Sequence, residues 1–364
     1  MFFPGAGQSC SPLCVKARNL TAFLPKLLQI SSILIGTVVA QRTVGGRDPT
    51  LKKFMKIECI LCPTDLSPDS DEALRYAIAL TRAYNAELIL LHCDVTARGL
   101  KTAAGLDEAG DALRESLQEY SGSADLDGID WKSVVTTCDD AGEAISREAG
   151  RYGADLIVMR SRRRPHRAAL LGSTAESVSR TAPCPVLVMH SDERDWVNGA
   201  DSRVELKRVL VAYDFSDYSE LALNSALSFA QEYQSELHLL HVLPPHSLSD
   251  SEISWYPLGR EGAYHKAAHR LQKAVSPEAQ LWCNVKHAVS EGQPYREILN
   301  YAEKNKIDLI CLGAHGAGFG MRALFGSNVD RVLRQAPCPV LVTRPLKPAM
   351  SYRRATQTGI AASA

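Results

Sequence analysis

Ala182-Pro-Cys-Pro-Val-Leu-Val188 recurs unchanged as Ala336-Pro-Cys-Pro-Val-Leu-Val342, much further along the chain. A Gly-Ser pair precedes each stretch at the same spacing, Gly172-Ser173 and Gly326-Ser327. Further upstream, similar segments recur in the same order: Thr64–Ser67 with Tyr213–Ser216, Leu90–His92 with Leu239–His241, and Ala154–Ile157 with Ile307–Ile310. The repeat is far longer than a solenoid unit, so the chain contains a duplicated domain, and each copy is expected to have its own core.

The duplication divides the chain of 364 residues into five expected segments. They are an extra N-terminal segment at residues 1–54, a first domain at 55–192, a polar linker at 193–206, a second domain at 207–346, and a disordered tail at 347–364. This length suits two domains of ordinary size.

Residues 1–54 belong to neither repeat and contain an uncharged run, Leu27–Gln41. The run is shorter than the ~20 apolar residues of a usual membrane span. Two interpretations stay open: the translation start is mis-assigned and Met55 begins the protein, or the segment is a cleaved or anchoring targeting sequence.

The composition is that of an ordinary globular protein, with 45% hydrophobic residues, 23% charged residues and a formal net charge of zero. Neither nucleic acid nor a membrane is therefore expected as a partner. Ten cysteines follow no disulfide framework, which favours the cytoplasm. Cys59-Ile-Leu-Cys62 has CxxC spacing, but it lies in an apolar strand and no second pair completes a zinc site, so no metal or redox role is expected of it.

Strands and helices alternate in both copies, and the strands are continuously apolar. This pattern predicts an α/β fold, in which helices cover both faces of a parallel sheet. The third strands are expected at residues 131–137 and 281–289, each with a tryptophan near its start, Trp131 and Trp282. The last strands are expected at 185–189 and 339–343, and their pairing within one chain would close one edge of each sheet.

Ligands of open parallel sheets bind at the carboxyl ends of the strands. In the second copy, a glycine-rich segment from Gly313 to Ser327 leaves one strand and enters a helix. Its glycines and the helix N-terminus match what a phosphate group needs. Asp214 follows the first strand, and His241-Val242 ends the second. Each feature alone also suits a structural role, a turn carboxylate for Asp214 and a core residue for His241.

The spacing Gly313-x2-Gly316-x9-Gly326-Ser327 resembles the signature of the ATP-binding branch of the universal stress protein family. The resemblance extends from Met55 to about residue 345. It implies two tandem Rossmann-like domains of the adenine nucleotide alpha hydrolase-like type, each a five-stranded sheet in the order 3-2-1-4-5. It also implies that the two domains pair through their last strands. A further homodimer stays open.

The resemblance implies that ATP is the ligand, with Mg²⁺ or Mn²⁺ carried by the nucleotide. Two groups of residues would bind it: Gly313, Gly316, Gly326, Ser327 and Asn328 for the phosphates and ribose, and Tyr213, Asp214 and Val242 for the adenine. No catalytic residue is implied.

The first copy departs from this pattern. Arg160 and Arg163 stand where the two glycines should be, and Pro165 removes one backbone N–H donor. We therefore expect the first copy to bind ATP poorly or not at all. Its arginine-rich loop is either a solvated basic loop or a side-chain site for another anion.

Three functions stay open at this point. The first is a nucleotide-binding protein of the stress response, with one ATP site and a regulatory role. The second is a slow ATPase or phosphotransfer enzyme, although the sequence contains no P-loop lysine and no evident general base. The third is a ligand-free interaction scaffold, for which the intact glycine spacing of the second copy would have no purpose.

Overall fold

A computed structural model describes most of the two repeats. The described residues are 55–94, 128–161, 172–190, 193–198, 203–245, 259–315 and 326–344, together with Asp111, Glu115 and Leu126. The expected tail, the segment 1–54 and Gly316 lie outside them, and so does most of an expected helix near residues 107–120. Every described residue belongs to one compact unit, Lys53–Ala364.

The first copy alternates strands and helices as its sequence predicts. Its elements are β1 (Cys59–Thr64), α2 (Pro68–Tyr84), β2 (Glu87–Asp94), β3 (Asp130–Thr137), α4 (Ala141–Tyr152), β4 (Leu156–Arg160), α5 (Ser173–Thr181) and β5 (Val186–Met189). Helix α2 begins with Pro68 at a position where its missing N–H costs nothing, and Asn85 ends it in the left-handed conformation.

The second copy repeats this order. Its elements are β8 (Arg208–Ala212), α6 (Asp217–Tyr233), β9 (Glu236–Leu243), α8 (Gly259–Ala274), the 3₁₀ turn η1 (Ala279–Leu281), β10 (Val285–Glu291), α9 (Pro294–Lys304), β11 (Leu309–Gly313), α10 (Ser327–Gln335) and β12 (Val340–Thr343). The expectation that the third strand starts at Leu281 is wrong. Leu281 is 86% exposed, and Trp282 follows the 3₁₀ turn instead of opening the strand.

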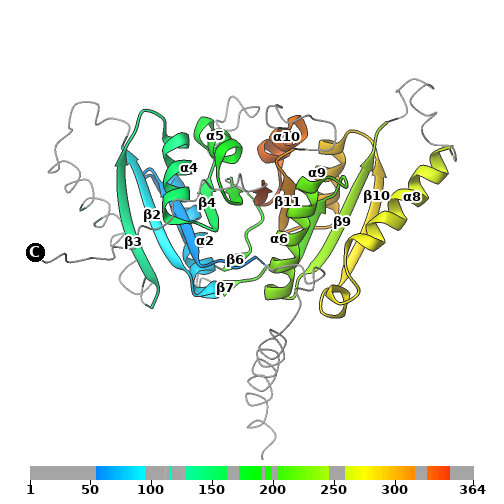
Figure 1. Cartoon of the computed structure of the whole chain (residues 1–364), viewed down its shortest axis with the longest axis horizontal. Coiled ribbons are helices and arrows are strands. Elements are labelled where there is room, and N and C mark those ends of the chain that lie inside the picture. Colours follow the sequence, from blue (N-terminus) through cyan, green and yellow to red (C-terminus); the bar gives the residue numbers. More distant parts are fainter. Residues whose placement is uncertain are drawn as a thin grey trace, which may run out of the picture. The chain divides into compact units, whose positions relative to one another are not determined.

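All ten strands of the two repeats form one sheet, in the order β10-β9-β8-β11-β12-β5-β4-β1-β2-β3 (Figure 1). Within each copy the pairs are parallel and the order is 3-2-1-4-5, as predicted. The copies join where β12 pairs with β5 in antiparallel register, with Leu341 opposite Leu187. The predicted pairing of the last strands within one chain is therefore confirmed.

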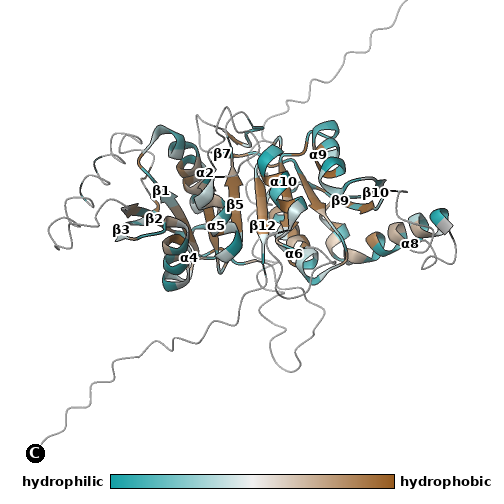
Figure 2. Cartoon of the chain, turned by 90° about the horizontal axis from the view of Figure 1, so that it is seen from above, coloured by the Kyte–Doolittle hydropathy of each residue, from teal (hydrophilic) through white to brown (hydrophobic). Residues whose placement is uncertain are grey.

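Alternate residues of the strands enter two different hydrophobic clusters. Ile60 and Cys62 belong to a cluster with α2 and α6, whereas Cys59 and Leu61 belong to a cluster with α4, α5, α9 and α10. Successive side chains of a strand point to opposite faces, so helices cover both faces of the sheet. Figure 2 shows the brown, hydrophobic strands β5 and β12 side by side at the centre. Both clusters draw on both copies, so the two domains share their core.

The segment between the copies is more structured than its polar composition indicates. A short hairpin, β6 (Val197–Asn198) with β7 (Arg203–Val204), follows Trp196, which is 2% exposed. The Trp196 ring meets the Tyr76 ring edge-on at 4.6 Å between centroids. Arg194 donates to the carbonyl oxygens of Ala302 and Ile307, at 3.1 and 2.6 Å, in the second copy. The linker therefore binds both repeats.

The described cysteines are free thiols, and most are buried. Burial raises the pKa of Cys59 to about 11 and that of Cys62 to about 12, and both side chains are buried, so the CxxC pair has little access to solvent. Among the described residues, no group of three or more His, Cys, Asp or Glu side chains could hold a metal ion. None of the described helices is long and apolar enough to cross a membrane.

Candidate functional site

The sheet brings the predicted site residues of the second copy to one edge. Tyr213 follows β8 directly, Val242 lies near the end of β9, and Gly313 ends β11. The register aligns these ends, because β8 pairs with β9 on one side and with β11 on the other. The first turn of α10 begins at Ser327, after its N-cap Gly326. Gly316 lies outside the described residues, so its predicted role stays a prediction.

Asp214 forms a tight turn at the entrance to α6. Its Oδ1 accepts hydrogen bonds from the backbone N–H and the hydroxyl of Ser216, at 3.1 and 2.5 Å. The turn holds Phe215 at a φ of 64°, which is uncommon for a residue other than glycine. The first copy has the same turn at Asp65, with Leu66 at a φ of 60°. Asp214 therefore has the structural role of a turn carboxylate, which its sequence position also suits. The turn fixes its carboxylate at the carboxyl edge of the sheet.

Hydrogen bonds hold both the side chain and the backbone carbonyl of Tyr213. Its hydroxyl donates to the carboxylate of Glu220, and burial raises its pKa. His241 Nδ1 lies 2.8 Å from the Tyr213 carbonyl oxygen. Because a carbonyl only accepts, Nδ1 carries the proton, and burial lowers the pKa of His241 and favours the neutral ring. The matching contact in the first copy joins His92 to Thr64 at 3.0 Å. His241 therefore fixes the strand ends and is placed as a structural residue.

Gly313 has a packing role that the sequence did not indicate. A Cβ built at this position would lie 2.6 Å from the carbonyl carbon of Tyr218 and 2.7 Å from its carbonyl oxygen. These distances are too short for any real Cβ, so the first turn of α6 packs directly on the Gly313 backbone. The glycine is thus required by packing, whether or not a ligand binds.

Gly326 differs from Gly313, because protein packing does not require it. Its φ of −58° is open to any residue, and a Cβ there would meet ordinary contacts, the nearest at 3.5 Å from the Ala314 carbonyl oxygen. No side chain caps the helix that follows. Ser327 is exposed and Asn328 is half-buried. The first backbone N–H groups of a helix have no partner within the helix, and they carry the positive end of its dipole. The start of α10 therefore has the chemistry of an anion site.

Two residues at this edge were missed in the sequence. The Phe215 ring packs on Tyr213, at 5.2 Å between centroids, and on His241, at 4.6 Å. The guanidinium of Arg270, from α8, lies 3.8 Å from the centre of the Phe215 ring. A cation–π contact of this kind brings a positive charge to the site from a distant helix. Phe215 lies within the repeated segment Tyr213–Ser216, but no local pattern marks Arg270.

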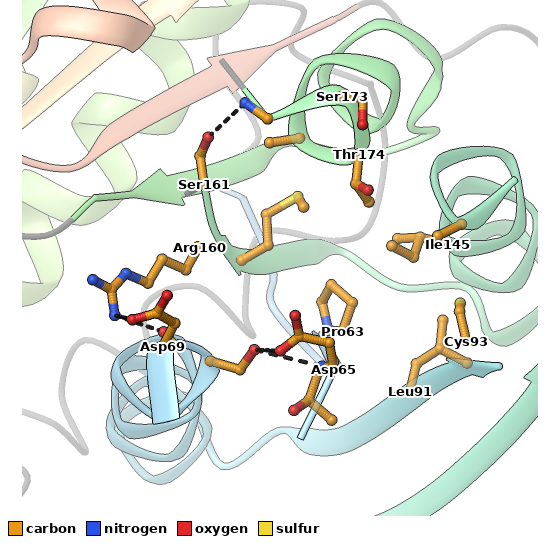
Figure 3. A pocket seen from close by; sticks show the side chains of 16 residues that line it. Pro63, Asp65, Asp69, Leu91, Cys93, Ile145, Arg160, Ser161, Ser173 and Thr174 are labelled. Carbon is orange, nitrogen blue, oxygen red and sulfur yellow. Dashed lines mark hydrogen bonds and ion pairs between the residues drawn. The ribbon is translucent and has the colours of Figure 1, made fainter. Parts of the chain in front are cut away.

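The first copy contains a pocket of about 590 Å³ at the same edge of the sheet (Figure 3). It is lined from the ends of β1, β2 and β4 and from the start of α5, by residues that include Asp65, Arg160, Ser161, Ser173 and Thr174. The Ser161 hydroxyl accepts a hydrogen bond from the Gly172 N–H, at 3.2 Å. The replacement of the first glycine by Arg160 has therefore not filled the space.

Arg160 occupies the position that corresponds to Gly313, and it reaches toward α2. Its Nη1 donates to the Asp69 carbonyl oxygen at 2.7 Å and lies 3.5 Å from the Glu72 carboxylate. The pKa of Glu72 is raised by burial, and the charge of Arg160 opposes that rise. Only 15% of the Arg160 side chain is exposed, and it both holds β4 against α2 and lines the pocket. Where Gly313 contacts α6 in the second copy, the first copy therefore has an arginine that links β4 to α2.

Comparison with known proteins places both repeats in one family. A sequence model of the universal stress protein family matches residues 56–190 and 205–344. A universal stress protein of Mycolicibacterium smegmatis is 28% identical over 308 residues, which cover 79% of this chain and 97% of that protein. One from Methanocaldococcus jannaschii is 32% identical over 141 residues, covering 38% of this chain and 82% of that protein. A crystal structure of a universal stress protein from Archaeoglobus fulgidus matches with a TM-score of 0.59 at 25% identity, covering 79% of this chain and 98% of that one.

Proposed function

Because the chain belongs to the universal stress protein family, as a tandem of two family domains, we propose that its second domain binds ATP and that the protein acts as a nucleotide-binding regulator of the stress response. The observation that carries the proposal is the start of α10. Gly326 leaves open a space that a Cβ would fill, next to an uncapped helix N-terminus. A glycine that the protein's own packing does not require is what close approach of a phosphate would require.

The residues at the edge fit an adenine nucleotide. The N–H groups at the start of α10 and the hydroxyl of Ser327 would hold phosphate oxygens, and Asn328 lies beside them for phosphate or ribose. Gly313 and Gly316 would let the intervening loop approach the phosphates. When bound, ATP would bring Mg²⁺ or Mn²⁺ on its own phosphate oxygens.

The adenine would lie between the ends of β8 and β9. Tyr213 and Val242 would supply backbone and apolar contacts there, and the held carboxylate of Asp214 would accept from the base or the ribose. Asp214 already accepts two hydrogen bonds from Ser216, which suits binding more than proton transfer. We therefore assign binding to this site, without rapid turnover of ATP.

The first domain is proposed to bind ATP poorly or not at all. Arg160 places a side chain where the second domain has bare backbone, and its charge is already paired with Asp69 and Glu72. We also propose a cytoplasmic location, which the free cysteines of the described residues support, because oxidising compartments favour disulfides.

Matched alanine variants at the two helix starts test the proposal. Gly326→Ala should fold normally, and its affinity for ATP with Mg²⁺ should fall at least tenfold, because a methyl group enters the phosphate cradle. Gly172→Ala makes the same change at the start of α5 and should leave ATP affinity unchanged. Equal affinities of Gly326→Ala and the unmodified protein would show that ATP does not bind at α10.

A further inference from the structure

Two cysteines of the first domain lie together at the carboxyl edge of the sheet. Cys93 is the residue before the end of β2, and Cys138 follows the last residue of β3. These strands pair in parallel, with Cys93 opposite Thr136, so Cys138 lies two residues further along and on the same face. The two thiols are in hydrogen-bond contact with each other.

This pair differs from the other described cysteines in its access to solvent. Cys93 and Cys138 are half-buried, whereas the rest are buried: Cys59, Cys62, Cys184, Cys283, Cys311 and Cys338. The corresponding places in the second copy hold Val242 and Gly292, neither of which is a thiol. The dithiol is therefore a property of the first domain and not of the shared fold.

Cys93 also lines the first-domain pocket. Figure 3 shows it beside Leu91 and Ile145 on the wall opposite Arg160. A change in the bonding of Cys93 therefore changes the wall of a pocket that has no assigned ligand.

We infer that Cys93 and Cys138 form a reversible disulfide when the protein meets a peroxide, and that this bond is an oxidation-sensitive site on the wall of the first-domain pocket. The two thiols lie on neighbouring strands and on one face of the sheet, and Cys138 lies just outside its strand, where the backbone can move to bring the sulfurs to bonding distance. The remaining cysteines of the described residues are buried and have no comparable access.

The chemistry balances with one hydrogen peroxide. The Cys138 thiolate attacks one peroxide oxygen and the O–O bond breaks. The sulfur becomes a sulfenic acid, and the other oxygen leaves as hydroxide, which takes up a proton to form water. The Cys93 sulfur then attacks the Cys138 sulfur and the S–O bond breaks. The disulfide forms and a second water leaves. Two electrons pass from the two sulfurs to the peroxide.

Cys138 is the sulfur that reacts first. Burial raises the pKa of both thiols, to about 12 for Cys93. The contact between them lowers the pKa of Cys138 and raises that of Cys93, which makes Cys138 the more easily ionised thiol. Arg147 opposes the rise at each, whereas Glu148 adds to it at Cys93, and Asp140 and Asp139 add to it at Cys138. Because the thiolate is the reactive form, the reaction is slow at neutral pH and accelerates with pH. Between pH 7 and pH 8 the rate should rise about tenfold, since a thiol well below its pKa gains thiolate in that proportion.

The test uses the full chain and peptide mapping. The protein is treated with hydrogen peroxide, blocked with N-ethylmaleimide, digested with trypsin without reduction and analysed by mass spectrometry. We expect peptide 83–98 joined to peptide 133–147, and its separation by dithiothreitol. Peptide 57–75, which contains Cys59 and Cys62, is the internal control and should stay in the thiol form.

Two serine variants make the result decisive. Cys138→Ser should abolish the joined peptide and leave Cys93 open to N-ethylmaleimide, and Cys93→Ser should leave Cys138 as a sulfenic acid that dimedone traps. The inference is overturned if the peptides never join, or if the Cys59–Cys62 peptide is oxidised at the same rate. It is also overturned if the joined peptide forms equally fast at pH 7 and pH 8.

Discussion

Gly313 and Tyr218 are in direct backbone contact, so closely that a Cβ on residue 313 would lie 2.6 Å from the Tyr218 carbonyl carbon. This contact packs the first turn of α6 on the end of β11. It gives one of the predicted ligand glycines a role in the fold itself, and it separates Gly313 from Gly326, where a Cβ has room.

Gly313→Ala should therefore lower the free energy of unfolding by about 1–3 kcal/mol, because the added methyl group forces α6 away from β11. Urea denaturation would measure the change. Gly326→Ala is the matched control and should change stability by less than about 1 kcal/mol, since its backbone conformation suits alanine. Equal losses in both variants would contradict the packing role.

Arg160→Gln should destabilise the first domain by about 1.5–3 kcal/mol, because it removes a charged hydrogen bond to the Asp69 carbonyl oxygen. It should also raise the pKa of Glu72 further, since the charge of Arg160 favours the ionised carboxylate. An NMR titration of Glu72 would detect the change. Arg82→Gln is the control, because Arg82 is exposed and lies on α2, the helix that carries Glu72. A Glu72 pKa that does not move would show that this ion pair is not held in solution.

Acid should destabilise the second domain through its histidines. Burial lowers the pKa of His238, His241 and His287 below the ordinary value of 6.5. As the pH falls, these histidines therefore take up protons in the unfolded chain before they do so in the folded chain. The free energy of unfolding should be highest above pH 6.5 and should fall as the pH drops below it. Urea denaturation at pH 7.5 and 5.5 would measure the fall. It should be smaller in His241→Gln, and an unchanged fall would mean that His241 does not titrate in this way.

The shared sheet should make the two domains unfold together. Leu187 is fully buried in β5 and lies opposite Leu341 of β12. Leu187→Ala should cost about 2–5 kcal/mol and should reduce hydrogen-exchange protection in β8 as well as in β1. If only first-domain amides lost protection, the domains would be separate folding units.

The sequence predicted the parts of the fold that depend on repetition and period. Strand–helix alternation follows from the apolar strands and from the likeness between the copies. The 3-2-1-4-5 order and the pairing of the last strands were implied by the resemblance to the universal stress protein family. Leu281 misled because its apolar neighbours resemble a strand, whereas the chain forms a 3₁₀ turn there and leaves Leu281 exposed. An apolar pattern in the sequence does not by itself indicate that a residue is buried.

The sequence predicted that the candidate residues lie at one edge of the sheet, but it did not predict their different structural roles. The glycine spacing marked Gly313 and Gly326 alike, although only the structure reveals that α6 rests on one of them. Trp196 was hidden in a polar linker, since one aromatic residue makes no pattern. The reach of Arg160 to α2 and that of Arg270 to Phe215 join distant parts of the chain, which local sequence does not encode.

Calorimetric titration of the full chain with ATP and Mg²⁺, in parallel with Gly316→Arg, tests the central claim most directly. The account predicts one site per chain, lost in the variant, with the first domain silent. Two sites per chain, or one site that survives Gly316→Arg, would contradict it, and so would a chain that binds no adenine nucleotide.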